Sequence, residues 1–207
     1  MSMRLSRGVT VVGAFALVAA CSKGEKKVDS AATADSIARA NAAAAPAPAP
    51  APAPATLTDT NIFALLDEAN MMDSSGGAMA ATKGTSADVK AFGRDMARDH
   101  HTLRKGGADL AKKLKITPVP PAGDTLPATA KNMMDKMTQM AKGADWDKAY
   151  IDGEVATHQA VLNLLGAAGS AAQDTSLKAL ITKATPLVQA HLTKAQSIQT
   201  KLGAAKP

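Results

Sequence analysis

The stretch SADVKAFGRDMARDHHTLRKGGADLAKKLKI, from Ser86 to Ile116, is the part of the sequence that decides the fold prediction. Its apolar residues follow the three- and four-residue spacing of one buried helix face; they are Val89, Phe92, Met96, Leu103, Leu110 and Leu114. The gap in this stripe falls on His100 and not on His101. The sequence therefore predicts an amphipathic helix with an inward-facing histidine near its middle and with His101 on the surface.

The same arrangement recurs in two later helical patterns. His158 fills the centre of one apolar stripe and His191 lies on another. The residues that form these stripes are Ile151, Val155, Leu162 and Leu165 for the first, and Leu177, Leu180, Ile181, Val188, Ala195 and Ile198 for the second. Three separate helices are thus each expected to carry one inward-facing histidine.

The folded part of the chain is predicted to be all helix. Helical patterns cover about residues 59–82, 87–117, 127–142, 145–168 and 175–202, and no strand pattern is present. Four long amphipathic helices and one short helix predict an antiparallel four-helix bundle with an additional short helix. Within the first pattern, Gly76 and Gly77 indicate a kink, a break or a close approach to another helix. Pro186 should bend the last helix.

The beginning of the chain has the pattern of a targeting segment followed by a tether. Arg4 and Arg7 precede a short apolar run that ends at Cys21, the only cysteine, which is typical of a bacterial lipoprotein signal. We expect residues 1–20 to be the signal peptide, 21–56 to be a disordered Ala/Pro-rich linker, and 57–204 to be the bundle domain. An ordinary secretory signal with an incidental cysteine is the alternative. Lipid on Cys21 would attach the protein to the membrane, and Ser22 favours the outer membrane facing the periplasm.

Charge and composition argue against nucleic acid as a partner. The net charge is +6, and removing residues 1–20 takes away two arginines and no acids, which leaves +4. One Trp, one Tyr and three Phe provide almost no surface for base stacking. The sequence does not identify a protein partner.

Three histidine-centred motifs resemble one family of bacterial envelope proteins. These motifs are Phe92…Met96…Asp99-His100, Trp146-Asp147…Tyr150-Ile151…His158, and Leu177…Pro186-Leu187…His191-Leu192. In their order and spacing they are similar to domain of unknown function 4142, over roughly residues 60–202. The resemblance implies a ferritin-like bundle and an envelope location. It implies no specific activity.

The histidines form a candidate metal site. Positions near the middle of helices of similar length share one layer of a bundle, so we expect His100, His158 and His191 to converge, with Asp73 as a fourth group. Three imidazoles and a carboxylate are suitable ligands for Zn(II), Cu(II) or Fe(II). Asp99 and Glu154 are expected to accept hydrogen bonds and orient the rings. A structural polar layer without metal is the equally weighted alternative.

Other chemistries have weaker support. Ferritin-type di-iron sites need Glu-x-x-His pairs and further glutamates, whereas this domain has only Glu68 and Glu154. Eight methionines outside the signal could bind Cu(I), but helix-spaced methionine is more often core filler. No catalytic motif is present, so we favour a non-enzymatic protein. Two function classes remain: an envelope interaction or stress-related module, and a metal-binding bundle.

Overall fold

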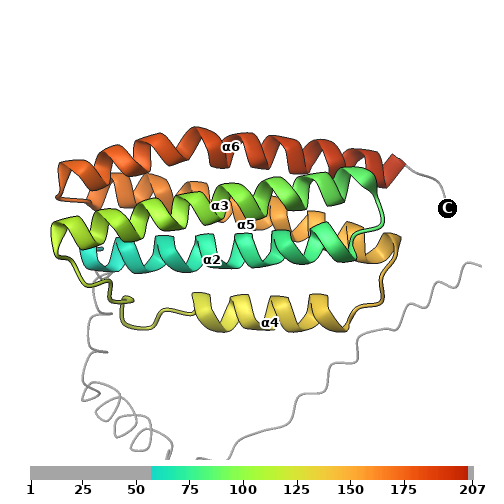
Figure 1. Ribbon diagram of the computed structural model, residues 1–207, viewed down its shortest axis with the longest axis horizontal. Helices are drawn as coiled ribbons and strands as arrows, with labels where there is room; N and C mark the ends of the chain where they lie inside the picture. Colours follow the sequence, from blue (N-terminus) through green and yellow to red (C-terminus); the bar gives the residue numbers. More distant parts are fainter. Residues whose placement is uncertain (1–56, 205–207) are drawn as a thin grey trace, which may run out of the picture. The chain divides into compact units, whose positions relative to one another are not determined.

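The computed structural model describes residues 57–204, and all of the regular secondary structure in this range is helical (Figure 1). The five helices are α2 (Asp59–Lys83), α3 (Ala87–Leu114), α4 (Leu126–Gln139), α5 (Ala144–Ala171) and α6 (Thr175–Ala204). The predicted signal peptide, Cys21 and the Ala/Pro-rich linker lie outside the described residues. The all-α prediction is confirmed.

The long helices form two antiparallel pairs, α2 with α3 and α5 with α6, which pack together through α3 with α6 and α2 with α5. Figure 1 shows that α3 and α5 run in the same direction, so the chain must return along the full bundle between them. The connection from residue 115 to residue 143 makes this return, and α4 within it lies against α2 and α5. One long crossover between two helical hairpins is the ferritin-like arrangement. The prediction of a four-helix bundle with one extra helix is therefore correct.

Some helix ends differ from the sequence prediction. Helix α4 ends at Gln139 rather than near Lys142, because Met140 has extended backbone angles. Helix α5 begins at Ala144, with Gly143 as its N-cap, and it continues past the predicted end at residue 168 to Ala171. Helix α6 continues through Pro186.

The start of α3 depends on a residue that the sequence did not point out. Ser86 is the N-cap, but its side chain makes no capping hydrogen bond. Instead, the carboxylate of Asp147, on α5, accepts hydrogen bonds from the backbone N–H groups of Thr85 and Ser86. Asp147 is buried. Its carboxylate connects the turn between α2 and α3 to the first turn of α5 and takes the place of a side-chain N-cap.

Gly77 and Gly93 allow α2 and α3 to approach closely. A Cβ atom at Gly77 would lie 2.7 Å from the carbonyl oxygen of Gly93, and a Cβ atom at Gly93 would lie 2.7 Å from the carbonyl oxygen of Gly77. No larger residue fits at either position without moving backbone. Helix α2 is continuous through Gly76 and Gly77, which excludes a break, and the close approach to another helix that these glycines suggested is present at Gly77.

The apolar core forms two clusters. One contains Ile62, Phe63, Leu165 and Ile181, and the other contains Phe92, Met96, Trp146 and Ile151. On each of the three helices that carry a buried histidine, the histidine lies along the sequence between residues of one cluster and residues of the other. On α3, for example, His100 lies between Met96 of one cluster and Ala111 of the other. A buried polar layer therefore divides the core.

None of the described helices is both long enough and apolar enough to cross a membrane.

Candidate metal centre

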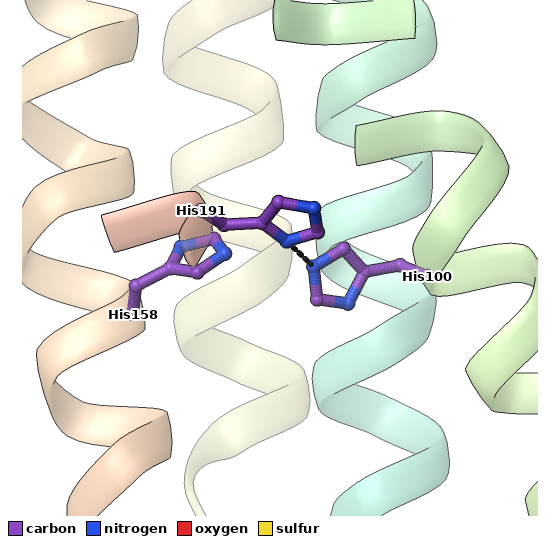
Figure 2. A group of neighbouring side chains, drawn as sticks. All are labelled: His100, His158 and His191. Carbon is purple, nitrogen blue, oxygen red and sulfur yellow. Dashed lines mark hydrogen bonds between the residues drawn. The ribbon is translucent and has the colours of Figure 1, made fainter. Parts of the chain in front are cut away.

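Three buried imidazole rings from three different helices meet in the middle of the bundle. His100 comes from α3, His158 from α5 and His191 from α6, and their exposed fractions are 1%, 0% and 5%. Their ring centroids are 5.1 to 5.6 Å apart. Figure 2 shows the three rings pointing toward one another. The convergence expected from the helix stripes is thus present in the structure.

His100 is held by an amide from α2. Its Nδ1 lies 2.9 Å from Oδ1 of Asn70, while Nδ2 of Asn70 donates to the carbonyl oxygen of Leu66 at 2.7 Å. The second bond fixes the amide orientation, so the oxygen faces the ring. An amide oxygen can only accept, and Nδ1 of His100 must therefore carry the proton. In a neutral ring this leaves a lone pair on Nε2.

The other two rings are held in the same manner. Nε2 of His191 donates to Oδ2 of Asp99 at 3.1 Å, and Nδ1 of His158 donates to the carbonyl oxygen of Glu154 at 2.9 Å. Hydrogen bonding by Arg98 and His191 outweighs the effect of burial and lowers the pKa of Asp99, so its carboxylate is an ionised acceptor. Neutral rings then keep lone pairs on Nδ1 of His191 and on Nε2 of His158.

The lone pairs face one another. Nε2 of His100 and Nδ1 of His191 are 3.2 Å apart, the contact drawn as a dashed line in Figure 2. Each of the three histidines offers a nitrogen within 4.8 Å of the other two. Nε2 of His158 has no hydrogen-bond partner among the described residues. With both rings neutral, these two facing lone pairs repel each other, and either an extra proton on one ring or a bound cation would relieve the contact.

Burial disfavours that extra proton on two of the rings. It lowers the pKa of His100 to about 3, with the charges of His158 and His191 acting in the same direction. Burial also lowers the pKa of His191, although Asp99 opposes this. At His158 burial is outweighed by the hydrogen bonds that His158 donates to Glu154 and by the charges of Asp73 and Glu154, so the pKa of His158 is raised.

Two acidic residues lie on the outer side of the rings. Asp73 and Glu154 are each 2% exposed and form a second group with His158, whose candidate ligand atoms lie within 4.8 Å of one another. Oδ2 of Asp73 is 3.5 Å from Nδ1 of His100, the nitrogen that faces away from the other rings. Burial raises the pKa of Asp73 well above its usual value, and the charge of Glu154 raises it further. Asp73 therefore sits with Glu154 and not among the three inner nitrogens.

The remaining predicted residues are placed as follows. Asp99 contacts His191 rather than its neighbour His100. Glu154 accepts the hydrogen bond of His158 through its backbone carbonyl oxygen, and its carboxylate lies 3.3 Å from the same Nδ1. His101 is exposed. Asn70 was missed, although its position one helical turn before Asp73 puts it on the same face of α2 and could have revealed it.

The methionines gather elsewhere. Met96 and Met137 are buried in the core cluster around Trp146, and Met79, Met133 and Met140 pack against that cluster. This arrangement agrees with the interpretation of helix-spaced methionine as core filler.

The fold and the buried histidines define a ferritin-like helical bundle with a potential metal-binding centre. The chain belongs to the family described as domain of unknown function (DUF4142), whose model matches residues 43–198. Among solved structures, the chain is similar in fold to "CopM in the Cu(II)-bound form", with a TM-score of 0.58 and 14% sequence identity over 71% of this chain and 99% of that chain. No curated protein matches the sequence.

Proposed function

We propose that the protein binds one divalent transition-metal ion through Nε2 of His100, Nε2 of His158 and Nδ1 of His191. The observation that carries this proposal is the direction of the hydrogen bonds. Every ring donates its one proton outward, to Asn70, Glu154 or Asp99, and keeps its lone pair inward. Metal-binding histidines are usually held by such outer acceptors.

The spacing of the nitrogens is suitable for coordination. Two nitrogens bound to one ion at about 2.05 Å, with a tetrahedral angle, lie about 3.3 Å apart. The 3.2 Å between Nε2 of His100 and Nδ1 of His191 agrees with this value. The His158 ring completes the set by closing on the ion from the facing helix. Three neutral ligands leave a fourth position for water, which suits Cu(II) or Zn(II).

Cu(II) is the first metal to test. Imidazole sites generally bind Cu(II) more tightly than other divalent ions of its row. The Cu(II)-bound CopM structure shares the fold, which adds support for copper in particular. Methionine sulfur is not part of the proposed site. The protein would then buffer, store or sense the metal without catalysing a reaction.

A purely structural histidine layer is the competing explanation for this site, and it fits a bundle that serves only as an interaction or stress-related module. It requires one of His100 and His191 to be protonated, so that their 3.2 Å contact becomes a hydrogen bond. Burial opposes this, since it lowers the pKa of both rings. We therefore favour the metal-binding function.

The two explanations are separated by metal titration of four single variants. His100→Ala, His158→Ala and His191→Ala should each abolish stoichiometric binding of Cu(II) and Zn(II) in equilibrium dialysis. His101→Ala is the matched control, because it removes an exposed imidazole next to His100, and it should bind like the parent protein. Equal binding by all four variants would refute the proposal.

We also propose that the protein works in the bacterial envelope, attached to the outer membrane through lipid on Cys21. The support is the sequence pattern before Cys21 and the absence of any other cysteine. Cys21→Ser should release the domain from the membrane fraction or leave an uncleaved precursor. Processing and fractionation identical to those of the parent would contradict the anchor.

A further inference from the structure

A cavity of about 390 Å³ lies within the bundle and reaches the histidine centre, because His100 and Asn70 are among the residues that line it. Its walls come from α2, α3, α5 and α6 and from the prolines that follow α3. Most of this wall is apolar and includes Phe63, Leu103, Leu165, Ile181 and Val188. The volume is in the range of about 300 to 1,000 Å³ that is typical of pockets for small organic molecules.

The polar residues that line the cavity are Asp67, Glu68, Asn70, Asp73, His100 and Arg104. Glu68 lines it, and Asp124 lies beside Glu68 at the start of α4. When both groups are ionised, the buried Oε2 of Glu68 and Oδ2 of Asp124 have no hydrogen-bond donor within residues 57–204; the two side chains can bond to each other only if one is protonated. Farther inside, the buried carboxylate of Asp73 also lines the cavity, and its Oδ2 likewise has no hydrogen-bond partner there.

The carboxylates of Glu68 and Asp124 form no salt bridge with a Lys or Arg side chain among the described residues. The pKa of Glu68 is raised from 4.5 to about 7 by burial first, then by a hydrogen bond with the Asp124 carboxyl group and by the charges of Asp124 and Asp67. Arg104 is the one Lys or Arg among the described residues that line the cavity. It is already paired with Asp67, through bonds of 2.8 and 3.2 Å.

We propose that this cavity binds an organic ammonium ion with an apolar body. The charged nitrogen lies between the carboxylates of Glu68 and Asp124, where it supplies the donors that their unpartnered oxygens lack. The hydrocarbon part lies along the apolar wall between the helix pairs. This site does not rest on the proposed metal function.

Charge complementarity selects this class of ligand over others. An organic anion would meet Glu68, Asp124 and Asp73 without a free cation to bind it. A neutral apolar molecule would fill the space but leave the buried carboxylate oxygens unpaired, which is costly. An ammonium ion satisfies both the apolar wall and the carboxylates.

The test uses three probes that share one hydrocarbon chain and differ in their head groups. These are n-octylammonium, n-octanol and octanoate, each titrated calorimetrically into the metal-free full-length protein at about pH 8, where Glu68 is ionised. The ammonium should bind at least about tenfold more tightly than the alcohol. Octanoate should not bind measurably. Ammonium affinity should also fall when the pH is lowered below the Glu68 pKa of about 7.

Variants locate the binding site. Glu68→Gln should lower n-octylammonium affinity at least about tenfold while leaving n-octanol within about twofold. Gly107→Leu should block all probes, because Gly107 lines the cavity and a Cβ there meets open space. Gly106→Leu is the matched control: its Cβ also meets open space, but Gly106 does not line the cavity, so binding should be unchanged.

Four outcomes would overturn the proposal. They are no binding of n-octylammonium, equal affinity for the ammonium and the alcohol, tighter binding of octanoate, and unchanged binding in Gly107→Leu. Ala184→Leu fills the cavity from the α6 side and serves as a second blocking variant. His100 belongs both to the cavity wall and to the candidate metal centre, so the titrations are repeated with metal-loaded protein. Because the ammonium group is proposed to lie at Glu68 and Asp124, the same order of affinities is expected with and without metal.

Discussion

Nε2 of His100 and Nδ1 of His191 face each other at 3.2 Å, although both residues already donate their ring proton elsewhere. The contact joins α3 to α6, and so connects one helical hairpin to the other in the centre of the core. The repulsion between the two lone pairs can be relieved by a metal ion or by one additional proton. Burial lowers the pKa of both rings, which disfavours the additional proton and supports the proposed metal site.

The outer hydrogen bond to His191 should tune metal affinity without supplying a ligand. Asp99→Asn removes the charged acceptor for Nε2 of His191, and we expect metal affinity to fall about 10- to 100-fold with one ion still bound per chain. Asp95→Asn is the control: Asp95 lies one turn earlier on α3 and pairs with Arg98 and Lys194 instead of a histidine. Competition with a chelator of known affinity measures both variants. An equal loss in the two would mean that surface charge, and not ring orientation, sets the affinity.

Metal binding should weaken in acid, with His158 as the first ring to protonate. The pKa of His158 is raised above its usual 6.5, whereas that of His100 is lowered to about 3. Protons therefore compete with the ion at His158 as the pH falls through its pKa, while His100 remains neutral. The measurement is the metal dissociation constant across the pH range. Affinity that stays constant through the His158 pKa would contradict this assignment.

The glycine contact should be required for stability. Gly77→Ala places a Cβ 2.7 Å from the Gly93 carbonyl oxygen, which must push α2 away from α3, and we expect a loss of roughly 1–3 kcal/mol in the free energy of unfolding. Gly106→Ala meets nothing within 4 Å, so it should instead stabilise α3 by roughly 0.5–1 kcal/mol. Denaturant unfolding of the two variants compares them directly. Similar effects of the two substitutions would argue against the close approach.

Glu68 should make stability depend on pH in a defined direction. Its pKa is raised from 4.5 to about 7 in the folded protein, so between these values the folded chain holds a proton that the unfolded chain has released. This contribution to stability is fully present below the unfolded pKa and is lost as the pH rises through the folded pKa. Glu68→Gln imitates the protonated form. Its thermal midpoint relative to the parent should therefore increase as the pH rises through about 7, and a constant difference would count against the raised pKa.

The sequence predicted the helices and the inward histidines because both follow from spacing along one helix. His100 fills the gap in an apolar stripe, and that is enough to place it inside. Contacts between helices could not be read in this way. Asp147 caps α3 from α5, and Asp99 holds His191 of α6 rather than His100 beside it, so both roles depend on helix packing. The glycine pair left several alternatives open until the position of Gly93 opposite Gly77 was known.

Asp73 illustrates the same limit at the candidate site. Its mid-helix position correctly places it in the polar layer, close to His100 and His158. Position along α2 does not determine which side of the imidazole rings the carboxylate faces. That depends on how α2 packs against α3, which places Oδ2 of Asp73 3.5 Å from the outward-facing Nδ1 of His100.

X-ray absorption spectroscopy of the full-length protein loaded with one equivalent of Cu(II) tests the central claim most directly. Three imidazole nitrogens should appear at about 2.0 Å, with the outer-ring scattering typical of histidine and no sulfur in the first shell. The same measurement on His101→Ala should give an identical spectrum. A first shell of oxygen without imidazole, or one containing methionine sulfur, would contradict a metal centre formed by His100, His158 and His191.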